Sequence, residues 1–139
     1  MTARQCIILH IDDDQDDVFL LQRAIIQAAI PCDVRAVSTP HEAQDYLNGV
    51  GAYSNRQRFP LPNLIVTDLA FRGGCGLEFL EWLRSDANFS SLRVVCATGS
   101  EDPERLKRAA SFDAECVPKN AVFREVTEVI AKCCAKSSL

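Results

Sequence analysis

The run LIVTDLAFRGGCG at Leu64–Gly76 carries the strongest indication of fold class in this chain. Its first three residues are apolar and partly β-branched, which is typical of a strand buried on both faces of a parallel sheet. Asp68 ends the run, and three glycines then favour an immediate turn. A carboxylate at the carboxyl end of such a strand faces the crevice where open α/β sheets bind ligands. Asp68 is therefore a candidate functional residue, although an aspartate that starts a turn or caps a helix gives the same pattern.

A second acidic strand end supports the functional interpretation. Cys6–Ile11 has the composition of a buried strand, and Asp12 and Asp13 follow it directly. The acids further along suit the start of a helix, with Asp14 as the cap and Asp17 in the first turn. That structural explanation does not cover Asp12 and Asp13, because they precede the helix.

Apolar periodicity predicts that strand and helix alternate five times. This alternation implies a parallel sheet with right-handed crossovers and helices on both faces. The predicted strands are Cys6–Ile11, Asp33–Val37, Leu64–Asp68, Arg93–Ala97 and Glu115–Val117. The predicted helices are Val18–Ala29, a helix from Pro40 to a stop at Gly49, Leu77–Arg84, Pro103–Phe112 and Val122–Cys134.

Length and composition limit the classes of function. The chain has 139 residues, which suits one domain, and 47% of them are hydrophobic, which argues against disorder. The formal net charge of -4 gives no electrostatic case for a nucleic-acid partner. No apolar stretch is long enough to span a bilayer, and the first residues lack the pattern of a signal peptide. We therefore expect a single domain that works in the cytoplasm, away from membranes.

Seven cysteines are scattered over the chain without a CxxC pair or an ordered Cys/His spacing. This arrangement argues against a zinc site and against a disulfide framework. We expect most of them to be small core residues. Cys133 and Cys134 are adjacent, which leaves a redox role for them as the alternative.

Polar residues follow four of the predicted strands. They are Asp12 with Asp13, then Asp68, Thr98 and Lys119, and in a doubly wound sheet these strand ends share one edge. Clustered carboxylates repel one another unless a cation offsets them, and an all-oxygen ligand set suits Mg²⁺. A hydroxyl and an ammonium beside such a metal are the groups needed to hold a phosphoryl group during transfer.

These residues, in this order, resemble the receiver domain of two-component response regulators over essentially the whole chain. The resemblance implies a flavodoxin-like α/β fold, with a five-stranded parallel sheet of order 2-1-3-4-5 and helices on both faces. It also implies a single receiver domain over residues 1–139, without an output domain. The positions that match the family pattern are Asp12-Asp13, Asp68, Gly76, Thr98-Gly99 and Lys119.

The resemblance assigns a role to each acidic residue. Asp68 would take a phosphoryl group from a sensor histidine kinase or a histidine phosphotransfer protein and become an aspartyl phosphate. Asp13, Asp68 and the backbone carbonyl of Ala70 would bind Mg²⁺ directly, and Asp12 would act through a metal-bound water. No separate enzyme activity is implied beyond self-phosphorylation and self-dephosphorylation.

The same resemblance implies how the signal would leave the site. Lys119 would balance charge on the phosphoryl oxygens, and Thr98 would hydrogen-bond one of them and shift. An unknown downstream protein would then bind. The basic side of Pro103–Phe112 and the last helix, Val122–Cys134, are candidate faces for it or for a second copy of the chain. Val50–Asn63 is either a surface excursion or a partner contact; it is similar to the extended loop of stand-alone receivers that partner bacterial phytochrome-type kinases.

Three departures from the family pattern leave other functions open. Cys116 stands where receivers usually carry an aromatic residue, Asn120 follows Lys119 in place of proline, and Arg72 replaces a common proline. A receiver-like interaction module that does not depend on phosphorylation is therefore the alternative. A small phosphatase of similar topology is disfavoured, because its general acid would occupy the position of Ala70.

Overall fold

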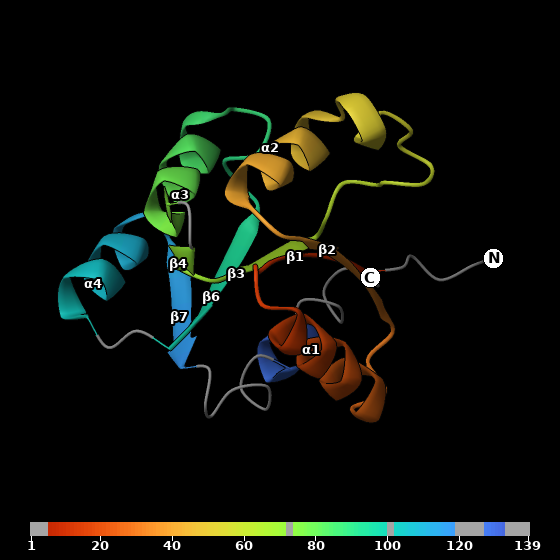
Figure 1. Ribbon diagram of the computed structural model, residues 1–139, viewed down its shortest axis with the longest axis horizontal. Helices are drawn as coiled ribbons and strands as arrows, with labels where there is room; N and C mark the ends of the chain where they lie inside the picture. The colour runs from red at the N-terminus through yellow and green to blue at the C-terminus, as the bar shows by residue number, and fades with distance from the viewer. Residues whose placement is uncertain (1–5, 72–73, 100–101, 119–126, 133–139) are drawn as a thin grey trace.

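Five parallel strands form the central sheet of this computed structural model, which describes residues 6–71, 74–99, 102–118 and 127–132 (Figure 1). They are β1 (Cys6–Ile11), β2 (Cys32–Val37), β3 (Leu64–Thr67), β6 (Arg93–Thr98) and β7 (Ala114–Pro118). Their order in the sheet is β2-β1-β3-β6-β7. This is the predicted order 2-1-3-4-5, because the short strands β4 (Ala70–Phe71) and β5 (Gly74–Cys75) pair separately in an antiparallel hairpin.

The hairpin and some strand bounds differ from the sequence-based prediction. The hairpin lies in a glycine-rich segment that was predicted to be a turn only. β6 and β7 both run past the last apolar residue of their predicted strands, because their backbones stay paired as far as Thr98 and Pro118. Pro118 can end β7 because this strand lies at the edge of the sheet, where a missing N–H breaks no ladder.

Helices cover both faces of the sheet. α1 (Gln15–Gln27) and the helical residues 127–132 pack on one face, and α2 (Pro40–Asn48), α3 (Gly76–Ser85) and α4 (Pro103–Ser111) pack on the other (Figure 1). Each face has its own core cluster, because successive strand residues point to opposite sides. The rest of the predicted helix Val122–Cys134, including both adjacent cysteines, lies outside the described residues. None of the described helices is long and apolar enough to cross a membrane.

The helix starts follow from capping residues. Asp14 caps α1 by accepting a hydrogen bond from the Asp16 backbone N–H at 2.9 Å, which confirms its predicted role. α1 begins at Gln15, three residues before the start predicted at Val18. Apolar periodicity does not indicate this start, because the first turn of the helix is acidic. Thr39 caps α2, and Gly49 ends it in the left-handed conformation with φ +66°.

The segment 50–63 is more ordered than its polar composition predicts. It contains a 3-10 helix, η1 (Gly51–Tyr53), and an aromatic trio in which the ring centroids of Tyr53 and Phe59 each lie within 6.0 Å of Tyr46. Arg56 donates hydrogen bonds to the backbone carbonyls of Tyr46, Leu47 and Phe59 at 2.6–3.1 Å. These contacts fold the segment onto α2.

Candidate functional site

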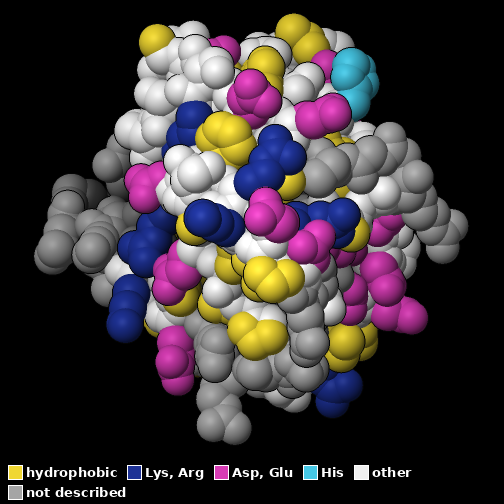
Figure 2. Space-filling model, turned by 90° about the vertical axis from the view of Figure 1, so that its left-hand side faces the viewer, with side chains coloured by type: hydrophobic (Ala, Val, Ile, Leu, Met, Phe, Trp, Pro, Cys, Tyr) yellow, Lys and Arg dark blue, Asp and Glu magenta, His cyan; other side chains and the backbone are white. Residues whose placement is uncertain are grey.

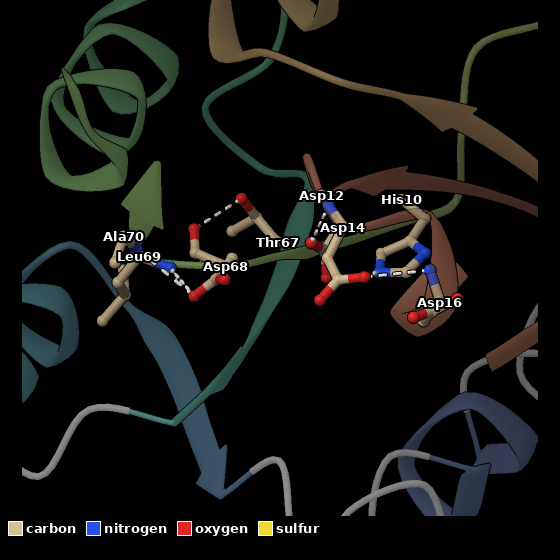
Figure 3. A network of polar contacts seen from close by, with 8 residues as sticks. All are labelled: His10, Asp12, Asp14, Asp16, Thr67, Asp68, Leu69 and Ala70. Carbon is tan, nitrogen blue, oxygen red and sulfur yellow. Dashed lines mark hydrogen bonds and ion pairs between the residues drawn. The ribbon is translucent and has the colours of Figure 1, made fainter. Parts of the chain in front are cut away.

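The register of β1 against β3 brings two of the predicted acids together. Ile11 and Thr67 are partners in this parallel pair, and the Asp68 N–H donates to the Ile11 carbonyl at 3.1 Å. Asp12 and Asp68 therefore follow neighbouring strand ends at the carboxyl edge of the sheet (Figure 3). This placement confirms that the predicted strand ends meet at one edge.

Asp12 is fixed from two sides and almost fully buried, with 1% of its surface exposed. Its Oδ1 accepts a hydrogen bond from the Asp14 backbone N–H at 2.9 Å, and its Oδ2 lies 3.6 Å from Nε2 of His10 (Figure 3). His10 is itself 2% exposed, and its Nδ1 has no hydrogen-bond partner among the described residues. A core histidine thus contacts a predicted site acid.

The carboxylate of Asp68 is turned toward the backbone that follows it. Its Oδ1 accepts hydrogen bonds from the N–H groups of Leu69 at 2.7 Å and Ala70 at 3.3 Å. The Thr67 hydroxyl donates to the Asp68 carbonyl oxygen at 2.9 Å (Figure 3). These contacts orient the half-buried side chain and shape the turn into the β4–β5 hairpin.

Gly76, eight residues after Asp68, lies very close to the backbone of Asp68. A Cβ at this position would lie 2.7 Å from the Asp68 carbonyl oxygen and 3.1 Å from Cα of Leu69. The Gly76 N–H also donates to the Leu69 carbonyl at 2.9 Å. Only glycine fits here without moving the backbone that carries Asp68.

A hollow of about 620 Å³ opens beside these strand ends. It is lined by the predicted metal ligands Asp13 and Ala70 together with Asp14, Gln15, Asp16 and Phe71. Carboxylates dominate this lining, so the hollow favours a cation. Asp13 is half-buried in its wall.

The donor types fit a magnesium ion. Mg²⁺ prefers oxygen ligands and retains several of its waters, so one or two carboxylates and a carbonyl suffice to hold it. Among the described residues, no three His, Cys, Asp or Glu side chains converge tightly enough to hold a metal. The carboxylates lie apart because Asp12 contacts Asp14 and His10, and because Asp68 bonds to the backbone of the turn that follows it. The structure therefore gathers the right ligands at one edge, with the carboxylates still apart.

Of the two remaining predicted site residues, Thr98 lies on the β6–β7 side. Thr98 is the last residue of β6 and pairs with Pro118 of β7, so its backbone lies at the same edge of the sheet. Lys119 and the departures Arg72 and Asn120 lie outside the described residues. The structure thus places Asp12, Asp13, Asp68 and Ala70 near the carboxyl edge of the sheet, and the backbone of Thr98 ends β6 at the same edge.

Sequence analysis missed a pair of cysteines near this edge. Cys96 of β6 and Cys116 of β7 are register partners, and their thiols are hydrogen-bonded. The signal was present in RVVCAT and AECVP, since aligning the two apolar runs puts their cysteines side by side. Cys116 had been considered only as the replacement of an aromatic residue.

Comparison with known proteins agrees with this arrangement, although no family model matches. A two-component response regulator of Arabidopsis thaliana is 26% identical over 117 residues, which are 78% of this chain and 51% of that protein. The phosphate regulon transcriptional regulatory protein PhoB of Klebsiella pneumoniae is 33% identical over 76 residues, 55% of this chain and 31% of that protein. The chain spans about half the length, or less, of these two curated relatives.

Solved structures match nearly the whole chain. A response regulator in red light signalling of R. palustris superposes with a TM-score of 0.80 at 26% identity, covering 91% of this chain and 90% of that one. The bacteriophytochrome response regulator RtBRR gives 0.79 at 28% identity, covering 92% and 77%. The phosphorylated cyanobacterial phytochrome response regulator RcpA gives 0.79 at 25%, covering 93% and 91%. In its strand order and its acidic strand ends, the chain is similar to response-regulator receiver domains over nearly its whole length.

Proposed function

We propose that this protein is a single-domain response regulator, spanning residues 1–139, whose Asp68 accepts a phosphoryl group in a Mg²⁺-dependent reaction. The observation that carries this proposal is the position of Asp68 at the end of β3. The neighbouring strand end carries buried Asp12, and Ala70, two residues after Asp68, lines the acidic hollow together with Asp13. The donor is a phosphohistidine of a sensor histidine kinase or of a histidine phosphotransfer protein. Reduced cysteines on four described strands are consistent with work in the cytoplasm.

The transfer needs few movements of the chain. An oxygen of Asp68 attacks phosphorus, the phosphorus–nitrogen bond breaks, and the histidine nitrogen keeps the electron pair. Asp13, Asp68 and the Ala70 carbonyl would hold Mg²⁺, with Asp12 acting through a water, and the bound ion would supply positive charge that offsets the charge on the phosphoryl oxygens. The N–H groups of Leu69 and Ala70 hold Oδ1 of Asp68, so an attack by this oxygen requires these two hydrogen bonds to break.

The new group brings about two negative charges, and these need cationic and donor partners. Lys119 supplies the balancing charge and Thr98 the hydrogen bond, which draws the end of β6 toward Asp68. A partner protein then binds to the rearranged surface. The protein carries out no catalysis beyond its own phosphorylation and dephosphorylation.

The partner face proposed here includes α4, whose Lys107 and Arg108 are exposed. Figure 2 shows basic side chains distributed over this side of the molecule, with acidic ones among them. The structural likeness to phytochrome response regulators supports a phytochrome-type kinase as the donor. Light scattering across a concentration series measures whether two copies of the chain bind each other.

Intact mass after incubation with acetyl phosphate and Mg²⁺ tests the acceptor. We expect one added phosphate on the wild type and on Asp45→Asn, a control in α2 that lies outside the site. Asp68→Asn should gain none. A phosphate on Asp68→Asn would refute Asp68 as the acceptor. No gain on the wild type, with acetyl phosphate and with a phosphohistidine donor protein alike, would refute the proposal.

A phosphorylation-independent interaction module is the second candidate. It is favoured by the separated carboxylates and by Cys116 in place of an aromatic residue. Calorimetric titration with Mg²⁺ separates the two: metal binding without phosphate uptake would support the module, and uptake would exclude it.

A further inference from the structure

Two thiols meet across the last pair of strands. Cys96 and Cys116 are partners in the parallel register of β6 and β7. Neighbouring strands lie about 4.8 Å apart, which is inside the range of about 4.4–6.8 Å that a disulfide allows between Cα atoms. Both side chains pack in the core cluster under α2, α3 and α4, so they share one face of the sheet. Both are free thiols.

The two thiols differ in reactivity. The hydrogen bond from Cys96 stabilises the thiolate of Cys116 and lowers the pKa of Cys116, against a smaller opposing effect of burial. That same hydrogen bond, and then burial, raise the pKa of Cys96. Cys116 is partly exposed, whereas Cys96 is fully buried. A partly exposed thiol with a lowered pKa is the one that reacts with oxidants, and its buried neighbour is placed to resolve the product.

The pair lies within electrostatic range of the phosphoacceptor site. The negative charge of Asp68 contributes to the raised pKa of Cys96, and the Arg84 guanidinium opposes it. Cys96 stands two residues before Thr98 in β6, and Cys116 stands three residues before Lys119. A bond between the thiols would join β6, which ends at Thr98, to β7, which ends one position before Lys119 in the sequence.

We propose that Cys96 and Cys116 form an oxidisable dithiol, a modification site for hydrogen peroxide that is separate from Asp68. The Cys116 thiolate attacks one peroxide oxygen, the O–O bond breaks, and the leaving hydroxide takes a proton to form water. The resulting sulfenic acid is attacked by the Cys96 sulfur, which gives up its proton. The S–O bond breaks, a second water leaves, and an interstrand disulfide remains. Two thiols are oxidised and one peroxide is reduced.

This chemistry requires neither Mg²⁺ nor a phosphoryl donor, so its test is independent of the proposed function. A second register pair, Cys6 of β1 and Cys32 of β2, provides an internal comparison within the same chain. Because the two pairs yield different linked peptides, mapping distinguishes them.

The experiment treats the reduced full chain with a graded excess of hydrogen peroxide, blocks remaining thiols with N-ethylmaleimide, and maps the digest by mass spectrometry. We expect a linked Cys96–Cys116 peptide, two hydrogens lighter than the sum of its reduced parts, which dithiothreitol restores. Cys32→Ser should leave this link unchanged. If Cys96 and Cys116 both remain open to alkylation at peroxide levels that oxidise other cysteines of the chain, the proposal is wrong.

A trapping experiment identifies the attacking thiol. In Cys96→Ser the resolving thiol is missing, so Cys116 should stop at the sulfenic acid and be labelled by dimedone, at least tenfold more than in the wild type. Cys96→Ala serves the same purpose if serine disturbs the core. Dimedone labelling of Cys96 in Cys116→Ser, without labelling of Cys116 in either Cys96 variant, would overturn the assigned order.

Discussion

The β1–β3 half of the sheet and the β6–β7 half are held together by different kinds of contact. On the first side, Asp12 and Asp68 bond to backbone N–H groups one or two residues away. On the second, contacts join residues far apart in the chain: Arg84 binds the carbonyls of Phe112 and Asp113, and Cys96 meets Cys116. The acidic side is thus arranged by its own local motifs, whereas the other depends on how distant segments pack.

The largest expected effect comes from removing the arginine that joins α3 to β6 and β7. Arg84 donates to four backbone carbonyls, and those of Phe112 and Leu92 are partly buried. Arg84→Met should lower the free energy of unfolding by about 3 kcal/mol, because these acceptors lose their donor. Urea unfolding measures the loss.

Arg56→Met is the matched comparison, since Arg56 also donates to carbonyls, but only within α2 and the neighbouring segment 50–63. We expect a smaller global loss and faster hydrogen exchange confined to that segment, because it can open without separating the strands. An equal or larger global loss in Arg56→Met would contradict the contrast drawn here.

Gly76→Ala should have the next largest effect. The added methyl would lie 2.7 Å from the Asp68 carbonyl oxygen, and a backbone atom cannot move aside as a side chain can. We expect a loss of about 2 kcal/mol, as for other overpacked sites, together with slower phosphorylation. Gly99→Ala, on the β6 side, is the control, because a Cβ there meets nothing within 4 Å. Similar urea midpoints for the two variants would count against a crowded Gly76.

His10→Leu examines how firmly Asp12 is held. Losing the imidazole beside Oδ2 frees the carboxylate to rotate, so Mg²⁺ affinity should fall about tenfold, as for other residues that orient metal ligands. Isothermal titration calorimetry reports the affinity. His41→Leu is matched in chemistry, but the His41 side chain is 85% exposed in the first turn of α2, and this variant should bind Mg²⁺ as the wild type does. An unchanged affinity in His10→Leu would mean that Asp12 needs no support from the core.

The smallest expected effect is a loss of stability in segment 50–63 at alkaline pH. Burial, and then the hydrogen bond to Glu42, raise the pKa of Tyr53 to about 12. Because the folded-state pKa lies above the ordinary value of 10.0, this contribution to stability is complete below pH 10 and is lost as pH rises toward 12. Ultraviolet titration of the wild type against Tyr53→Phe measures it. A tyrosine that ionises near pH 10 in the folded protein would refute the shift.

The difference between the two sides also explains what sequence could predict. Asp12, Asp13 and Asp68 follow apolar runs. These runs, together with the alternation of strands and helices, were enough to predict that the three acids lie at one edge of the sheet. The thiol pair depends on the β6–β7 register, which no single run of the sequence shows. His10 and Asp12 are two residues apart and so share one face of the chain, but this spacing alone does not show that the imidazole and the carboxylate meet. The β4–β5 hairpin escaped prediction because two-residue strands carry no periodicity.

The side chain of Arg56 limits which residues can stand at position 49. A Cβ at Gly49 would lie 2.7 Å from Nη2 of Arg56, and the φ of +66° already disfavours other residues. The guanidinium thus occupies space that only glycine leaves open, at the carbonyl end of α2. Homologues that keep this arginine should keep the glycine, whereas the φ of +66° favours glycine even where the arginine is replaced. An arginine at position 56 is therefore expected to occur together with a glycine at position 49 in an alignment of related sequences.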